Sequence, residues 1–77
     1  MQSITIENKT YSLNNISSED FRNPDWMDKN YRMLGAIINP FTNKDCYTIA
    51  CDNTRSLDDR LVMINQALTF ARGQAII

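Results

Sequence analysis

The segment from Thr54 to Gly73, TRSLDDRLVMINQALTFARG, constrains the fold most, because its apolar residues recur at the three- and four-residue spacing of an amphipathic helix. Ser56, followed three residues later by Asp59, resembles a capping box, in which the side chain of the first residue accepts a hydrogen bond from a free amide of the first turn. Gly73 suits the end of a helix. We therefore expect a helix from near Leu57 to Arg72.

The apolar side of this helix is unusually wide. Its central stripe is expected to face the core and consists of Leu57, Leu61, Ile64, Leu68, Ala71 and Ala75. Beside the stripe lie Met63, Ala67 and Phe70, which widen the apolar arc to about half of the circumference. These three residues either pack beneath the segment 15–32 or form a surface for a protein partner or for self-association, because aromatic residues and Met are enriched at interfaces. The second alternative predicts a small, non-catalytic regulatory or inhibitor-type protein that binds a protein partner, or itself, through its C-terminal helix.

The first segment, SITIENKTYSL, alternates apolar and polar residues and predicts a β-hairpin. A turn at Asn8 and Lys9 would place Ile6 opposite Tyr11. The same register would place Ile4 opposite Leu13, so that one face of the hairpin is apolar and the other is polar.

The middle of the chain predicts two short helical segments and a second hairpin. Ser17 or Ser18 can cap a helical turn, and Pro24 suits the start of a short helix near 25–31. We expect a strand near 33–38 and a second strand at 46–51, although the four-, three- and four-residue spacing of Met27, Tyr31, Leu34 and Ile38 also fits a helix that continues to residue 38. The predicted fold is a single α+β domain over residues 1–77, in which a small antiparallel sheet of two hairpins is covered by the C-terminal helix.

The size and charge of the chain narrow the range of partners. A chain of 77 residues buries only about 60% of its unfolded surface, so association with a partner or a second copy would add to a thin core. Eight basic and nine acidic residues give a net charge of −1, and the basic residues are scattered. Nucleic acid is therefore not an expected partner, because its binding needs clustered Lys and Arg.

No targeting feature is evident in the sequence. The N-terminus lacks the basic and apolar regions of a secretory signal, and no segment has the roughly 18 apolar residues of a membrane helix. We expect a cytoplasmic protein without a membrane partner. Cys46 and Cys51, on opposite sides of the predicted strand, are expected to be free, buried thiols.

The side chains that most enzymes need are scarce. The chain contains no histidine, which is the commonest general base and metal ligand. Two cysteines cannot complete a zinc site of the usual ligand count. The paired carboxylates are best explained as charges at helix N-termini. We therefore predict no catalytic residue, no metal site and no cofactor.

Two further sets of residues are candidates for binding. Trp26 could anchor a partner or seal a loop against the core. Arg55, Arg60 and Arg72 form an alternative site, in which an oligomer would sequester a small ligand such as a nucleotide.

Two stretches resemble proteins of phages and other viruses. ITIENKTYSLNNIS is similar to the opening hairpin of small uncharacterised bacteriophage proteins, and INQALTFARGQAI is similar to the helical hairpins of viral proteins that sequester cyclic nucleotides. The first resemblance implies no activity, whereas the second implies a nucleotide-binding oligomer. Residues 34–53 fit neither pattern, so the chain is not assigned to either group.

Overall fold

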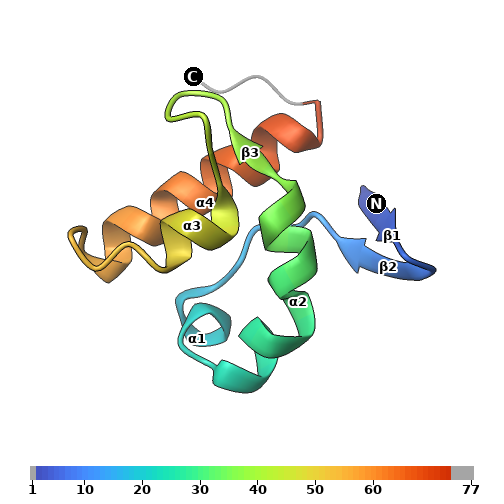
Figure 1. The fold of residues 1–77 in the computed structure, drawn as a ribbon, viewed down its shortest axis with the longest axis horizontal. Coiled ribbons are helices and arrows are strands. Elements are labelled where there is room, and N and C mark those ends of the chain that lie inside the picture. The colour runs from blue at the N-terminus through green and yellow to red at the C-terminus, as the bar shows by residue number, and fades with distance from the viewer. Residues whose placement is uncertain (1, 74–77) are drawn as a thin grey trace.

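The computed structural model describes residues 2–73, in which two separate two-stranded antiparallel sheets and four helices follow one another along the chain. The α+β class, the two antiparallel hairpins and the C-terminal helix are confirmed. Helix α2 stands between the β1–β2 hairpin on one side and α3 and α4 on the other (Figure 1). In chain order the elements are β1 (Ser3–Ile6), β2 (Lys9–Ser12), α1 (Ser18–Phe21), α2 (Pro24–Ala36), β3 (Ile38–Asn39), β4 (Lys44–Asp45), α3 (Cys46–Ala50) and α4 (Leu57–Ala71).

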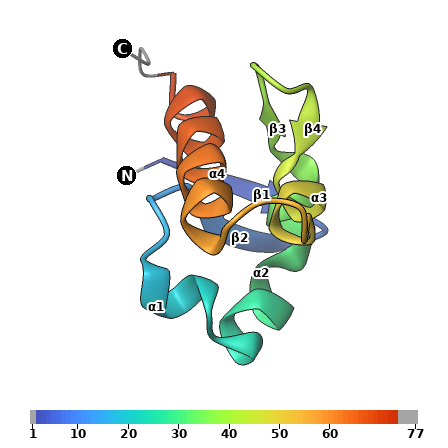
Figure 2. The ribbon, with the colours of Figure 1, turned by 90° about the vertical axis from the view of Figure 1, so that its left-hand side faces the viewer.

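The core is a single cluster to which the first hairpin, all four helices and the intervening segments contribute. Its buried apolar residues are Tyr11, Leu13, Ile16, Phe21, Met33, Leu34, Ile37, Cys46, Ile49, Ala50, Ile64, Ala67 and Leu68. The expected joining of both hairpins into one four-stranded sheet is wrong, because within residues 2–73 β1 pairs only with β2 and β3 only with β4. The second view shows the β3–β4 hairpin and α3 facing α4 across this core (Figure 2).

The first hairpin has the expected faces but a different register. Ile4 lies opposite Tyr11, and Ile6 lies opposite Lys9. The turn is centred on Glu7 and Asn8, both of which have positive φ, as the tight hairpin turn of type I′ requires. The predicted turn at Asn8 and Lys9 is therefore wrong by one position. Because this moves the pairing by two residues, the same side chains still face the core.

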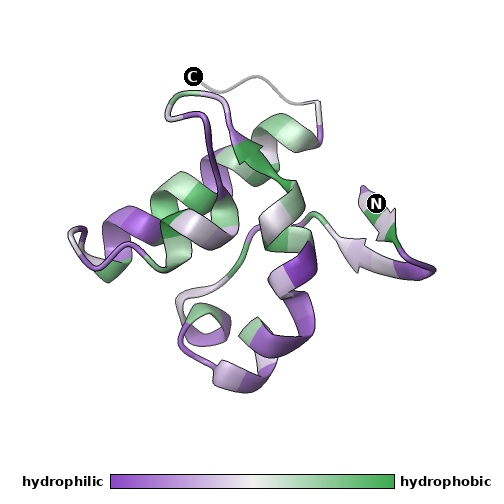
Figure 3. Ribbon diagram, viewed as in Figure 1, coloured by the Kyte–Doolittle hydropathy of each residue, from purple (hydrophilic) through white to green (hydrophobic). Residues whose placement is uncertain are grey.

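Helix α2 replaces the predicted short helix and the strand at 33–38. The Asn23 side chain caps it by accepting hydrogen bonds from the amides of Asp25 and Trp26. The helix continues past residue 31 because Met33 and Leu34 are buried in the core on its last turns. Its first turns are mostly hydrophilic, whereas the chain that leaves its last turn and enters β3 is hydrophobic (Figure 3). Only Ile38 and Asn39 form a strand, since Pro40 favours extended backbone before it.

Helix α3 occupies most of the predicted strand 46–51. The carboxylate of Asp45 accepts hydrogen bonds from the amide of Thr48 at 2.9 Å and from its hydroxyl at 2.6 Å, which caps the helix. Cys46, Ile49 and Ala50 are buried, at positions i, i+3 and i+4. This helical spacing, and not alternation, decides the conformation of the segment.

Helix α4 begins at Leu57 as predicted and ends at Ala71, one residue before the predicted end. The Ser56 hydroxyl accepts a hydrogen bond from the amide of Asp59 at 3.1 Å. Gly73 follows the last turn with φ +77 and donates its amide to the carbonyl of Phe70. Ile64 and Leu68 of the predicted stripe are buried and Leu57 and Leu61 are partly buried, whereas Ala71 is exposed and Ala75 lies outside the described residues.

Candidate functional site

Two half-exposed tyrosines meet where α2 and α3 pack together. Tyr31 of α2 is 46% exposed and Tyr47 of α3 is 45% exposed. Their ring centroids lie 6.4 Å apart with an angle of 62° between the planes, which is an edge-to-face contact. The two rings therefore pack against each other, while about half of each residue's surface stays exposed.

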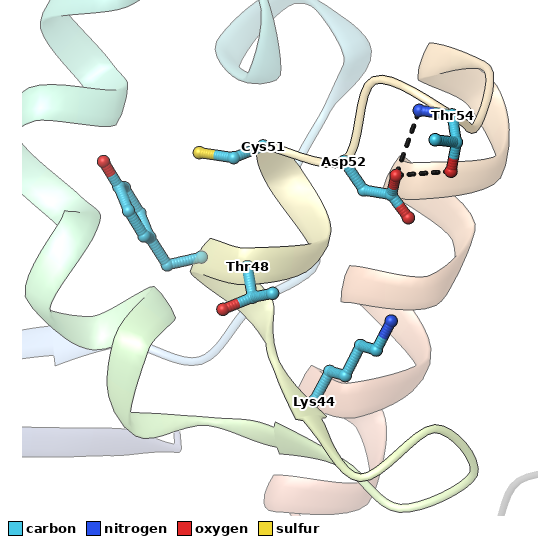
Figure 4. A pocket seen from close by; sticks show the side chains of 6 residues that line it. Lys44, Thr48, Cys51, Asp52 and Thr54 are labelled. Carbon is cyan, nitrogen blue, oxygen red and sulfur yellow. Dashed lines mark hydrogen bonds between the residues drawn. The ribbon is translucent and has the colours of Figure 1, made fainter.

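An open hollow lies on each side of Tyr47, and each has a volume of about 510 Å³. The first is lined by Lys44, Tyr47, Thr48, Cys51, Asp52 and Thr54 (Figure 4). The second is lined by Pro24, Met27, Asp28, Tyr31 and Tyr47. Because Tyr47 belongs to both, the two hollows form one surface, which we name the tyrosine groove.

Helix α3 is short, but its outer face is well fixed. The Asp45 cap sets the start of the helix, and buried Ile49 ties its inner side to the core. Tyr47 and Cys51, one turn apart, then point outward into the first hollow, as does Thr48. Three of the lining side chains are consequently ordered by local hydrogen bonds, namely those of Thr48, Asp52 and Thr54.

One end of the groove carries an ordered carboxylate. Asp52 accepts hydrogen bonds from the amide of Thr54 at 3.0 Å and from its hydroxyl at 2.5 Å, and it pairs with Arg55 at 3.5 Å. The hydrogen bond from the Thr54 side chain is the main cause that lowers the pKa of Asp52 below its ordinary value. The ammonium of Lys44 extends toward this carboxylate from below (Figure 4) and adds a smaller electrostatic contribution.

The two cysteines differ in accessibility. Both are free thiols, as the sequence predicts, but only Cys46 is buried, and Cys51 is exposed in the tyrosine groove. Burial raises the pKa of Cys46 to about 12, with a further contribution from the charge of Asp45. The expectation that both thiols are buried is wrong for Cys51, because residue 51 follows the last turn of a helix on its outer side and is not part of a strand.

The residues proposed for partner binding on α4 do not form one exposed surface. Ala67 is completely buried and belongs to the core. Met63 is partly buried against the core, whereas Phe70 is 56% exposed. Trp26 lies on α2, where it is partly buried against the core and borders a third, smaller hollow of about 290 Å³. Trp26 thus does not line the tyrosine groove.

The three arginines of the alternative ligand site are also separated. The Arg60 guanidinium donates to the carbonyl of Ala50, and that of Arg72 donates to the carbonyl of Leu13. Arg55 pairs with Asp52. Arg60 and Arg72 lie twelve residues apart on or beside α4, which corresponds to about 18 Å along the helix axis. The guanidinium groups therefore do not converge on one pocket.

Among residues 2–73, no group of three or more His, Cys, Asp or Glu side chains is arranged to hold a metal ion. Within the same residues, every helix is too short or too polar to cross a membrane.

Tyr31 and Tyr47 are not among the site residues predicted from the sequence. Tyr31 follows Met27 at a helical spacing, so its place on one face of α2 could have been found from the sequence. The position of Tyr47 on a helix could have been predicted from Asp45, a residue that favours the N-cap, placed three residues before Thr48, because this spacing indicates a helix that begins at Cys46. Their contact depends on how α2 and α3 pack, which no local pattern reveals.

No protein-family model matches the chain, and neither the search of curated proteins nor the search of solved structures found a significant match.

Proposed function

We propose that the chain is a small, non-catalytic regulatory protein that acts by binding a protein partner through the tyrosine groove. The observation that carries the proposal is the pair of half-exposed tyrosines, of which Tyr47 lines two adjoining hollows and Tyr31 lines one of them. Tyrosine provides a large contact area at the cost of ordering only two side-chain torsions, and it is enriched among residues that dominate binding.

The composition of the groove also fits a protein ligand. Met27, Pro24 and the two tyrosine rings supply apolar contact surface, and Asp28, Lys44 and Asp52 supply charged groups beside it. Protein interfaces combine aromatic and apolar contact area with polar groups in this way. Burying the remaining exposed half of each tyrosine would contribute on the order of 1 kcal/mol per ring.

The outer face of α4 offers less continuous apolar surface to a partner than the tyrosine groove does. Its two large exposed apolar residues, Val62 and Phe70, are eight positions apart, which is about 12 Å along the helix and about 80° around it. They are separate exposed side chains and do not form a continuous patch. Ala67, which would have linked Met63 to Phe70, is buried.

The proposal can be tested by site-specific photo-crosslinking in cells that produce the protein. A benzophenone-bearing amino acid is placed at position 47 or, as a matched aromatic control, at position 70. The proposal expects a discrete protein adduct from position 47 and little or none from position 70. Adducts from position 70 alone would place the binding surface on α4, and the absence of any adduct from position 47 would refute the proposal.

A further inference from the structure

We propose that the second hollow of the tyrosine groove receives an arginine side chain of the protein partner. This hollow is lined by Pro24, Met27, Asp28, Tyr31 and Tyr47. The inference rests on the proposed function, because it names the chemical group that this part of the groove recognises. Its basis is a carboxylate without a partner and two tyrosine rings that line the same hollow.

The second hollow carries a negative charge that is not balanced within it. Among the described residues that line it, Asp28 is the one charged group. Within residues 2–73, its carboxylate has no hydrogen-bond or ion-pair partner. The first hollow differs, because Lys44 and Asp52 both line it and interact electrostatically. Complementary charge in a ligand of the second hollow is therefore positive.

Helix α2 places the carboxylate beside one of the rings. Asp28 and Met27 precede Tyr31 by three and four positions, so both are its neighbours on one face of the helix. Residues at these spacings have Cβ atoms about 5–6 Å apart. Tyr47 comes from α3, contacts Tyr31 and lines the same hollow. A group that lies against the Tyr31 ring is thus within reach of the Asp28 carboxylate.

The tyrosine pair suits a cation with a planar charged group. The face of an aromatic ring attracts a cation that lies within about 6 Å of the ring centroid. The two centroids are 6.4 Å apart, so a single cation can be that close to both. The guanidinium of arginine can stack on a ring and donate two hydrogen bonds to one carboxylate. Met27 and Pro24 offer apolar surface to the methylene groups of the same side chain.

Binding of short peptides to the purified full chain, followed by heteronuclear NMR, tests the inference. The probe is a blocked alanine–arginine–alanine tripeptide. The matched control peptide has citrulline in place of arginine, which keeps the shape of the side chain and removes its charge. We expect the arginine peptide to shift the resonances of Asp28, Tyr31 and Tyr47. The citrulline peptide should bind about three- to thirtyfold more weakly, because it lacks both the cation–π contact and the ion pair.

A pair of charge variants locates the effect. Asp28→Asn should weaken binding of the arginine peptide by about two- to fivefold, as the loss of an exposed ion pair requires. Asp58→Asn removes the same charge from α4, outside the groove, and should leave the affinity unchanged. The NMR spectrum of each variant establishes that it is folded.

Three results would each overturn the inference. They are the absence of shifts at the three hollow residues, equal affinity for the arginine and citrulline peptides, and an Asp28→Asn variant that binds the arginine peptide as well as the unaltered chain does. A protein adduct from position 47, in a chain that does not bind the arginine peptide, would refute the arginine site and leave the proposed function standing.

Discussion

Asn39→Ala should strongly destabilise the chain, because Asn39 is a fully buried polar residue with three hydrogen bonds. Its amide Nδ2 donates to the carbonyl of Met63 at 2.8 Å, and its Oδ1 accepts from the amides of Phe41 and Thr42 at 2.8 and 3.2 Å. The side chain thus fastens the β3–β4 hairpin to the middle of α4. Alanine would remove all three bonds and leave main-chain groups without a partner.

The magnitude follows from these contacts. At about 1 kcal/mol of net stability per hydrogen bond, the loss is about 3 kcal/mol. A chain of this length has roughly 4–12 kcal/mol of total stability, so the midpoint of thermal unfolding should fall by about 12–24 °C. Urea and thermal unfolding, followed by circular dichroism, measure both quantities.

Asn43→Gly is the matched control in the same hairpin. Asn43 is exposed and has φ 58, a backbone conformation that glycine adopts without strain. We expect a change within about 0.5 kcal/mol. If Asn39→Ala changed the free energy of unfolding by less than about 1 kcal/mol, or no more than the control did, the hairpin would not be held to α4 through this side chain.

Three other contacts make separate contributions that can be measured. Asn65→Ala should cost about 1–2 kcal/mol in urea unfolding, because the Asn65 side chain both accepts from the Ile16 amide and donates to the Ile16 carbonyl; a loss as small as that of the neighbouring Gln66→Ala would contradict this. The hydrogen bond from the Thr48 side chain is the main cause that lowers the pKa of Asp45 below 3.8 in the folded chain. Ionised Asp45 therefore contributes to folding stability above pH 3.8, and this contribution is lost as the pH falls through the lower pKa of the folded state. Asp45→Asn should therefore flatten the loss of stability in acid, and an unchanged acid profile would be evidence against the cap as its source. In a disulfide-exchange assay with an aromatic disulfide, one thiol should react rapidly in the folded protein and Cys51→Ser should remove this phase, whereas rapid reaction of both thiols would contradict the burial of Cys46.

Where local signals agreed, the sequence was sufficient to predict structure. Helix α4 was predictable because Ser56, the helical spacing of its apolar residues and Gly73 all indicate the same element. The faces of the first hairpin followed from alternation. The register of this hairpin did not follow, because it depends on whether Glu7 or Lys9 shares the two central turn positions with Asn8. Neither residue favours the positive φ that these positions require.

In the segment of α3, the strand propensity of the residues predicts the wrong secondary structure. Tyr, Thr and Ile favour strands on average, and they predicted a strand at 46–51. The Asp45 cap and the burial of Ile49 among helices outweigh that preference. The tyrosine groove depends on this outcome, because a strand would have placed Tyr47 and Thr48 on opposite faces. The candidate site was therefore missed together with the helix that carries it.

The most direct measurement of the central claim is the rate at which Cys51 is alkylated in cells that produce the protein, compared with the rate in the dilute purified chain. Cys51 lines the tyrosine groove, and Cys46 is buried, so Cys51 acts as a built-in probe of coverage. A reporter on α4, made by combining Cys51→Ser with Phe70→Cys, is the control. We expect alkylation of Cys51 to be slowed about tenfold or more in cells, as burial in a protein interface requires, and that of the α4 reporter to stay unchanged. Equal rates for Cys51 in both settings, or protection of the α4 reporter alone, would contradict the tyrosine groove as the binding surface.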